Sequence, residues 1–269
     1  MKDFTNKIAV VTGGGTGMGR ELVCQLISAG AHVAMCDVSE DNMAETHNLA
    51  SKLGAGRLTS HRCDVSSEQD VLRFRDEVAQ QHETQHINLL FNNAGIAGPQ
   101  QPVEDIEVAA WQSTIDTDLN SVFYLTRLVI PLMKSRRSGL ILNMSSSAGR
   151  YGCPMRSPYV AAKWAAIGLA QTWAMELGPW NIRVNALCPG SVGGERIDRV
   201  IHRDAKERGM TPDEIRAVYQ RQSSLRDFVS REDIAAMVCF LSGPGGRMIS
   251  GQTLGIDGHT ESLANWLDP

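Results

Sequence analysis

The stretch that decides the fold is IAVVTGGGTGMG, residues 8–19. Consecutive apolar residues that run into a glycine-rich turn are typical of a short buried strand, which we place at Lys7–Val11. Apolar residues at helical spacing follow the turn and predict a helix over Thr16–Ser28. A strand, a glycine turn and a helix in this order indicate the first unit of an α/β fold.

The same alternation of short apolar runs and helical segments continues along the chain. Further strands are predicted at His32–Cys36, Arg57–Arg62, Ile87–Phe91, Leu140–Met144, Ile182–Cys188 and Gly251–Ile256. Short strands regularly separated by helices predict a parallel sheet that is covered on both faces. We therefore expect one Rossmann-type doubly wound α/β domain over residues 1–269, with seven parallel strands flanked by helices.

Several helix starts can be read from the sequence. Ser66 with Gln69 has the pattern of a capping box before a helix that ends near Gln81. Ser157-Pro158 has the pattern of an N-cap and a first helical residue, for a helix that runs to Leu177. The other expected helices or starts are Glu40–Leu53, two stretches within Glu104–Arg137, Thr211-Pro212 with Glu214, and Ser230 with Asp233, whose helix reaches Leu241.

Composition and charge exclude several classes of protein. The 269 residues are 42% hydrophobic and 21% charged, as in ordinary globular domains, and the net charge of −4 does not favour nucleic acid or an anionic membrane as a partner. We expect neither a membrane span nor a signal peptide. The six cysteines have no metal-ligand or redox spacing, so reduced thiols, no metal site and a cytoplasmic location are expected.

Polar and glycine clusters follow the predicted strands at the points where they end. In a doubly wound sheet, ligands bind beyond the carboxyl ends of the strands. The fold should therefore bring one residue from each cluster to the same edge: Gly13, Asp37, Asp64, Asn93, Ser146 and Val192.

The glycine turn is suited to a dinucleotide. Gly13, Gly17 and Gly19 permit a tight turn and a close approach of the backbone to a pyrophosphate, and the following helix offers N–H donors. Asp37 ends the second strand, where a carboxylate would bind the adenosine ribose hydroxyls and repel a 2′-phosphate. This pattern favours NAD over NADP, although Asp37 could also be a solvated turn residue.

The stretch YVAAK, residues 159–163, places a tyrosine and a lysine one turn apart on one helix face. A phenol in water titrates near pH ~10. A close ammonium stabilises the phenolate, so Tyr159 and Lys163 could form a general acid–base that acts on an alcohol oxygen. The alternative is a packed tyrosine beside a solvated lysine.

Taken together, these motifs resemble the short-chain dehydrogenase/reductase family over nearly the whole chain. The matching stretches are TGGGTGMG, Cys63-Asp64-Val65, NNAG at 92–95, NMSSSAG, YVAAK and Pro189-Gly190. The resemblance implies that Ser146 binds the substrate oxygen, that Tyr159 is the acid–base, and that Lys163 supports Tyr159 and binds the nicotinamide ribose. The cofactor-binding residues that it implies are Gly13, Gly15, Thr16, Gly17, Met18, Gly19, Asp37, Asp64, Val65, Asn93, Ala94, Gly95, Tyr159, Lys163, Pro189, Gly190 and Val192.

Two positions depart from the family pattern. Where many members have an asparagine in a proton relay, DTDLNSVF places Asp118, with Asn120 two residues later. Either Asp118 serves the relay as a carboxylate, which we favour, or Asn120 replaces it through a local kink. Where many members have a threonine after Pro189-Gly190, this chain has Gly194, which is expected to act as the hinge of a substrate lid at about 191–222.

The substrate is less clearly indicated. The expected lining of the pocket is rich in arginine and comprises Arg150, Tyr151, Arg156, Arg196, Arg199, His202 and Arg203. It could bind an anionic substrate, or it could be a solvated helix face with interleaved acids, which we favour. His259 could reach the rim of the pocket but is expected to be packed or exposed. Trp266 and Leu267 are expected to dock on another subunit.

Three functions are compatible with the sequence. The first is an NAD-dependent dehydrogenase of a secondary alcohol (a sugar, polyol or other small hydroxy compound, with or without an anionic group). The second is a ketone or 3-oxoacyl reductase, which Asp37 disfavours because biosynthetic reduction usually uses NADP. The third, a non-catalytic NAD-binding protein, conflicts with the intact Ser146, Tyr159 and Lys163 set. Family members are usually tetramers built through the long helices, so a homotetramer is expected from the resemblance.

Overall fold

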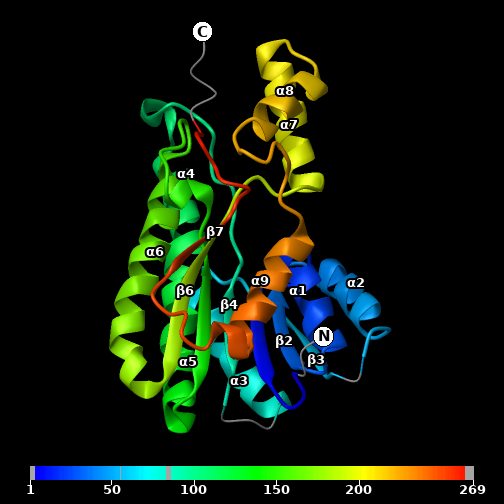
Figure 1. The fold of residues 1–269 in the computed structure, drawn as a ribbon, viewed down its shortest axis with the longest axis vertical. Coiled ribbons are helices and arrows are strands. Elements are labelled where there is room, and N and C mark those ends of the chain that lie inside the picture. The colour runs from blue at the N-terminus through cyan, green and yellow to red at the C-terminus, as the bar shows by residue number, and fades with distance from the viewer. Residues whose placement is uncertain (1–3, 55, 83–85, 264–269) are drawn as a thin grey trace.

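The computed structural model describes residues 4–54, 56–82 and 86–263, and the tail residues Trp266 and Leu267 lie outside these ranges. The described strands form one parallel sheet in the order β3-β2-β1-β4-β5-β6-β7 (Figure 1). Their bounds are β1 Ile8–Thr12, β2 His32–Asp37, β3 Leu58–Arg62, β4 Leu89–Asn92, β5 Gly139–Met144, β6 Ile182–Pro189 and β7 Thr253–Ile256. The predicted doubly wound α/β fold with seven parallel strands is confirmed.

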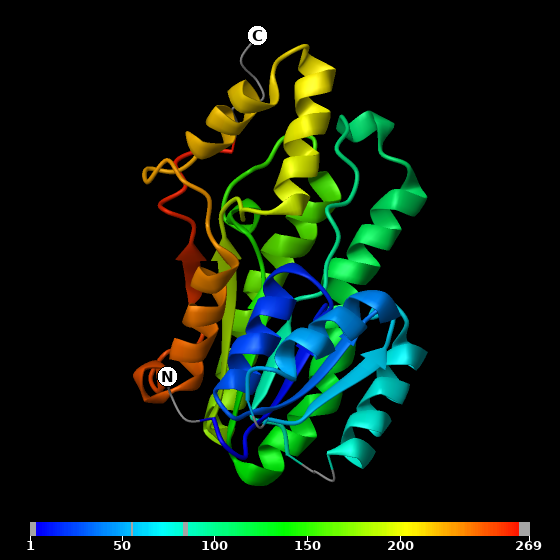
Figure 2. The same ribbon diagram turned by 90° about the vertical axis from the view of Figure 1, so that its right-hand side faces the viewer.

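Helices cover both faces of this sheet, as Figures 1 and 2 show. They are α1 Gly17–Ser28, α2 Glu40–Ala50, α3 Glu68–Gln81, α4 Val108–Ile115, α5 Ser121–Arg136, α6 Ser157–Leu177, α7 Glu195–Arg208, α8 Pro212–Gln220 and α9 Arg231–Ser242. Because side chains of a strand alternate between faces, Val11 packs with α1 and α9 while Val10 packs with α3, α5 and α6. Two apolar cores therefore hold the sheet between its helices.

The predicted cap of α3 is wrong by one residue. Ser67, not Ser66, is the N-cap, and its hydroxyl accepts a hydrogen bond from the Asp70 N–H (3.3 Å). Ser66 instead donates its N–H and O–H to the carboxylate of Asp64 (3.0 and 2.7 Å). The carboxylate competes for Ser66 because an aspartate readily binds the backbone two residues on.

The start of α6 also differs by one residue from the prediction. Arg156 occupies the N-cap position without a side-chain bond, and Ser157 is already helical. Proline is tolerated at Pro158 because the first N–H groups of a helix have no intrahelical partner. The expected capping boxes at Thr211 and Ser230 are both present.

Helices α7 and α8 form a separate unit above the sheet, with a small apolar cluster of their own that includes Ile201 and Ile215. The chain enters the unit through Gly194, whose φ of +120° favours glycine. The backbone therefore requires glycine at the base of α7.

A hydrogen-bonded chain of His61, Thr59 and His82 ties β3 to the end of α3. His82 Nε2 and Thr59 Oγ1 are 2.8 Å apart, and burial, followed by the nearby charges of Arg57, His32 and His61, lowers the pKa of His82 to about 4. As the pH falls, His82 is therefore protonated at a higher pH in the unfolded chain than in the folded protein. The free energy of unfolding should fall as the pH drops from about 6.5 to about 4.

We expect urea unfolding at about pH 7.5 and at about pH 5 to show the effect of His82 protonation on stability. Between these two pH values, the free energy of unfolding of the wild type should fall by about 1 kcal/mol more than that of His82→Gln. This difference is smaller than the pKa shift alone would give, because the imidazole of His82 is only half-buried. His47→Gln, on the exposed face of α2, should keep the wild-type pH dependence. Identical pH dependence in the wild type and His82→Gln would contradict the assignment.

Candidate active site

The ends of β1, β2 and β4 are joined at the carboxyl edge of the sheet. Asn93 Nδ2 donates to the carbonyl oxygens of Thr12 (2.9 Å) and Gly13 (3.2 Å). The Thr12 hydroxyl accepts from the N–H groups of Asn93 and Ala94, both at 2.9 Å. Thr12 was not singled out from the sequence, although it is the first residue of TGGGTGMG. These bonds hold the glycine turn against NNAG, as expected.

The glycine turn also contacts Asp37. The Gly15 N–H donates to Asp37 Oδ2 (3.0 Å), and the Ser39 N–H donates to Oδ1 (3.1 Å), so the carboxylate is oriented beside the turn. A side-chain carbon on Gly19 would lie 2.1 Å from the Gly13 carbonyl oxygen. Only glycine therefore allows α1 to begin this close to the turn.

Two arginines near this corner already have carboxylate partners. Arg20 donates to the Gly15 carbonyl oxygen (2.9 Å) and pairs with Glu45 (2.8 Å). Arg62 lies opposite Asp37 in the sheet register, and its guanidinium is 4.0 Å from Glu40. At this corner, the Asp37 carboxylate therefore lies near two arginines, Arg20 and Arg62, that already have carboxylate partners.

The remaining expected cofactor residues surround the same edge. Val65 is buried while Asp64 is exposed, and Gly190, directly after β6, donates its N–H to the Ile256 carbonyl oxygen (3.0 Å). Val192 forms an isolated parallel bridge with Val229. The described positions of the glycine turn, of the residues after β3 and β4, and of the Pro189-Gly190 segment are therefore all on the side where a ligand of this fold binds.

Lys163 is held in a buried ion pair. Its ammonium lies 3.0 Å from Asp118 Oδ2, and the two side chains are only 4% and 0% exposed. The ammonium also donates to the Met144 carbonyl oxygen (3.2 Å) and lies 5.4 Å from the centre of the Tyr159 ring. The charge of Lys163 is thus fixed between the end of β5, Asp118 and the tyrosine.

A π-helical turn, Asp116–Asn120, places Asp118 in this position. It joins α4 to α5, and Asp118 Oδ1 accepts from the Ile96 N–H (2.7 Å), directly after NNAG. Asn120 Nδ2 instead donates to Asp116 Oδ1 (2.7 Å). Of the two candidates for the asparagine position, Asp118 is therefore the one that contacts Lys163.

The serine run separates into two environments. Ser145 is buried, and its hydroxyl donates to the Lys163 carbonyl oxygen (2.7 Å), which ties β5 to α6. Ser146 is only partly buried, and its hydroxyl accepts from the Ala148 N–H (3.2 Å). Ser146 is therefore the accessible hydroxyl of the pair, beside the element that carries Tyr159.

Several residues expected around the substrate make bonds elsewhere. Arg150 pairs with Asp257 (3.3 Å), Arg199 pairs with Glu195 (3.7 Å) on the exposed face of α7, and His202 bonds the carbonyl oxygen of Asp198 within that helix. His259 is exposed and bonds Ser224 (2.6 Å). Arg156 and Arg203 are different because both reach Gln100.

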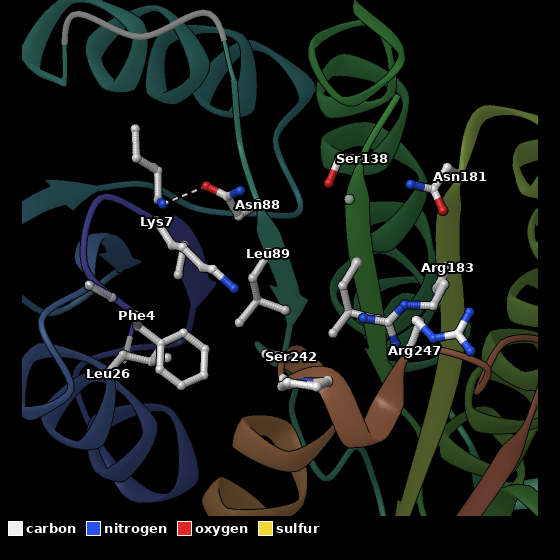
Figure 3. A pocket seen from close by; sticks show the side chains of 17 residues that line it. Phe4, Lys7, Leu26, Asn88, Leu89, Ser138, Asn181, Arg183, Ser242 and Arg247 are labelled. Atoms are coloured by element: carbon white, nitrogen blue, oxygen red, sulfur yellow. Dashed lines mark hydrogen bonds between the residues drawn. The ribbon is translucent and has the colours of Figure 1, made fainter. Parts of the chain in front are cut away.

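A cavity of about 240 Å³ lies at the opposite edge of the sheet, near the amino ends of β1, β4, β5 and β6 (Figure 3). Lys7, Arg183 and Arg247 contribute its cations. Arg183 donates to the carbonyl oxygens of Leu241 and Gly246, both at 2.8 Å, at the end of α9. The cavity is therefore remote from Tyr159, and its central arginine caps a helix.

All six cysteines have free thiols, and no cluster of three or more potential metal ligands occurs in the described ranges. Within the same ranges, no helix has both the length and the hydrophobicity needed to cross a bilayer.

Known proteins are similar to this chain in sequence and in fold. Residues 7–204 match the family model described as short chain dehydrogenase. The chain is 30% identical to the 3-oxoacyl-acyl-carrier-protein reductase of Thermotoga maritima, over 94% of this chain and 96% of that protein. It is also 30% identical to the D-beta-hydroxybutyrate dehydrogenase of Rhizobium meliloti, over 94% and 97%.

The structural likeness is equally extensive. The crystal structure of NAD+-bound xylitol dehydrogenase matches with a TM-score of 0.89 and 29% identity, over 95% of this chain and 99% of that one. The motifs, their assembly at one sheet edge and these matches agree. The chain therefore belongs to the short-chain dehydrogenase family of oxidoreductases.

Proposed function

We propose that this protein transfers a hydride between a secondary alcohol and NAD+. The observation that carries the proposal is the buried Lys163, fixed by Asp118 and the Met144 carbonyl oxygen beneath the ring of Tyr159. A buried cation next to a phenol favours the phenolate, which is the form that accepts a proton from an alcohol.

NAD fits the residues at the carboxyl edge. The glycine turn allows close backbone approach, and the N-terminus of α1 offers N–H donors for a pyrophosphate. The Asp37 carboxylate, oriented by Gly15 and Ser39, would accept hydrogen bonds from the two ribose hydroxyls and would repel a 2′-phosphate. The xylitol dehydrogenase structure, which contains NAD+, supports the same choice.

Each catalytic side chain would have one task. The Ser146 hydroxyl would donate to the substrate oxygen, and Tyr159 would take the hydroxyl proton while the hydride leaves the carbinol carbon. When bound, NAD+ supplies the hydride acceptor. An ammonium has three N–H donors. Lys163 donates one of them to the Met144 carbonyl oxygen and forms an ion pair with Asp118, so a donor remains for the nicotinamide ribose.

Asp118 would serve the proton relay as a carboxylate. Its two oxygens contact Lys163 and the Ile96 N–H, so it would hold the ammonium in place and bind water as an acceptor. The reverse reaction, reduction of a ketone or a 3-oxoacyl group, is the alternative, since the relative from Thermotoga maritima is a 3-oxoacyl reductase. Asp37 favours oxidation with NAD+ over reduction with NADPH.

We also propose one domain over the whole chain, with α7 and α8 as the substrate lid, and a cytoplasmic homotetramer. Phe123 on α5 and Trp164 on α6 are about half exposed, which is unusual for large apolar side chains and suits an interface between subunits. The six free thiols are compatible with a reducing compartment.

The cofactor proposal predicts a strong preference for NAD+. With alcohols from a panel of neutral and anionic sugars, polyols and hydroxy acids, kcat/KM should be at least about 100-fold higher with NAD+ than with NADP+, because a 2′-phosphate would face Asp37. Asp37→Ser should reduce this ratio to below about 10. Asp41→Asn, at an exposed carboxylate in the first turn of α2, should not change it. Equal rates of the wild type with both cofactors would contradict the role of Asp37.

A further inference from the structure

Two arginines from different elements meet at one neutral oxygen. Arg156 Nη2 donates to Gln100 Oε1 (2.8 Å), and the Arg203 guanidinium donates to the same oxygen. Arg156 also donates to the Ala97 carbonyl oxygen (3.2 Å). The segment after β4, the residue before α6 and the lid helix α7 are thus linked through a single amide.

This meeting point borders the acid–base residues. Arg156 directly precedes α6, whose first turn carries Tyr159. Ala97 follows Ile96, whose N–H binds Asp118. Figure 2 shows the lid helices and the segment leading into α4 standing above the same edge of the sheet. A group held between the two arginines would therefore lie at the mouth of the site.

Of the two guanidiniums, Arg203 has carboxylates nearby and Arg156, within the described ranges, does not. Among the described residues, no carboxylate lies within ion-pair distance of Arg156. Arg203 lies 3.6 Å from Asp204 Oδ1 and 3.8 Å from Glu207, whereas the hydroxyl of Tyr219 donates to the other oxygen of Asp204, Oδ2 (2.8 Å). The amide of Gln100 accepts hydrogen bonds but neutralises no charge.

A carboxylate would satisfy both guanidiniums better than the amide does. Each guanidinium presents parallel N–H donors that match the two oxygens of a carboxylate. Of the other arginines of the expected lining, Arg150 and Arg199 have carboxylate partners, and Arg196 is exposed. Arg156 and Arg203 are distinguished from them because both donate to one oxygen, Gln100 Oε1.

We propose that Arg156 and Arg203 form a carboxylate-binding subsite and that the substrate is a secondary hydroxycarboxylate. This inference rests on the proposed hydride transfer. The C–H bond of the carbinol breaks with its electron pair going to NAD+, the hydroxyl proton passes to Tyr159, and the products are an oxo acid, NADH and a proton. Because Arg203 belongs to α7, the bound carboxylate also holds the lid over the site.

Matched pairs of substrates test the subsite. The probes are short-chain 2-, 3- and 4-hydroxycarboxylates, each compared with its methyl ester in NAD+-dependent turnover. The best acid should exceed its ester in kcat/KM by roughly 10- to 100-fold, as expected for hydrogen bonds to a charged group. Arg156→Gln and Arg203→Gln should each bring this ratio toward one. Arg199→Gln, on the same lid helix but paired with Glu195, is the matched control and should retain it.

A binding measurement separates this inference from the proposed function. Calorimetry with the NADH-loaded enzyme should show butyrate binding at least about 10-fold more tightly than butyramide, and Arg203→Gln should remove the difference. If the enzyme oxidised the esters as fast as the acids, or if butyrate bound no more tightly than butyramide, the proposed subsite would be wrong. Hydride transfer would be unaffected by either result. Arginine-dependent butyrate binding without turnover of any alcohol would support the subsite and overturn the function.

Discussion

Replacing Tyr159 with phenylalanine should lower kcat by about 10³-fold or more while leaving NAD+ binding intact. A general acid–base contributes roughly 10²- to 10⁴-fold to a proton transfer, and no neighbouring group can take its place. Lys163 is committed to Asp118 and the Met144 carbonyl oxygen, and the hydroxyl of Ser146 is a far weaker base than a phenolate. Only the phenol oxygen is lost, so the ring and the cofactor edge should keep their packing.

Two measurements are needed for this variant. Steady-state turnover of the best alcohol gives the loss in kcat, and NADH binding followed by its fluorescence tests whether the cofactor site survives. Tyr124→Phe, in the core between α5 and the sheet, is the control for removing a phenol oxygen and should remain active. If Tyr159→Phe lost NADH binding, the phenol oxygen would be needed to hold the cofactor, and the loss of turnover would not identify Tyr159 as the acid–base.

Replacing Asp118 with leucine should destabilise the protein by about 3–5 kcal/mol, because it leaves the ammonium of Lys163 buried without a counter-charge. The free energy of unfolding from urea titration measures this. Asn120→Leu should cost much less, since Asn120 bonds only Asp116 among the described residues. A loss below about 1 kcal/mol in Asp118→Leu would show that the ion pair does not hold the site together.

Asp118→Asn separates charge from shape. The amide oxygen can still accept the Ile96 N–H, but the negative charge beside Lys163 is gone. More of the ammonium's field then acts on the phenol oxygen, so the acidic limb of the pH dependence of kcat/KM should move to lower pH. If the acidic limb lay at the same pH in the wild type and in Asp118→Asn, the carboxylate would have no electrostatic effect on the acid–base.

Local patterns were sufficient for the architecture. The apolar run before the glycines predicted β1 within one residue at each end, and the glycines, Asp37 and NNAG all lie at the carboxyl edge. This succeeded because each signal is short-ranged: a buried strand needs consecutive apolar residues, and a tight turn needs glycine. Helix ends were less exact, as at Ser66, where the carboxylate of Asp64 competes for the serine.

Only some of the residues of the candidate site could be predicted from the sequence. YVAAK and the serine run mark Tyr159, Lys163 and Ser146 because helical spacing and position after a strand are local properties. Gln100 carries no local signal: its importance comes from two arginines that lie 56 and 103 residues away along the chain. The arginine-rich lining was visible in the sequence, but which arginines are paired depends on where each carboxylate folds.

The sequence by itself determined the doubly wound sheet, the family and the chemical types of the residues at its carboxyl edge. Only the tertiary structure decided that Asp118, and not Asn120, contacts Lys163, because a π-helical turn sets which side chains of residues 116–120 face α6. Likewise, only the packing of the lid brought Arg203 to Gln100 and Arg156. Spacing along one chain fixes the face of a single helix, whereas contacts between elements depend on how those elements pack.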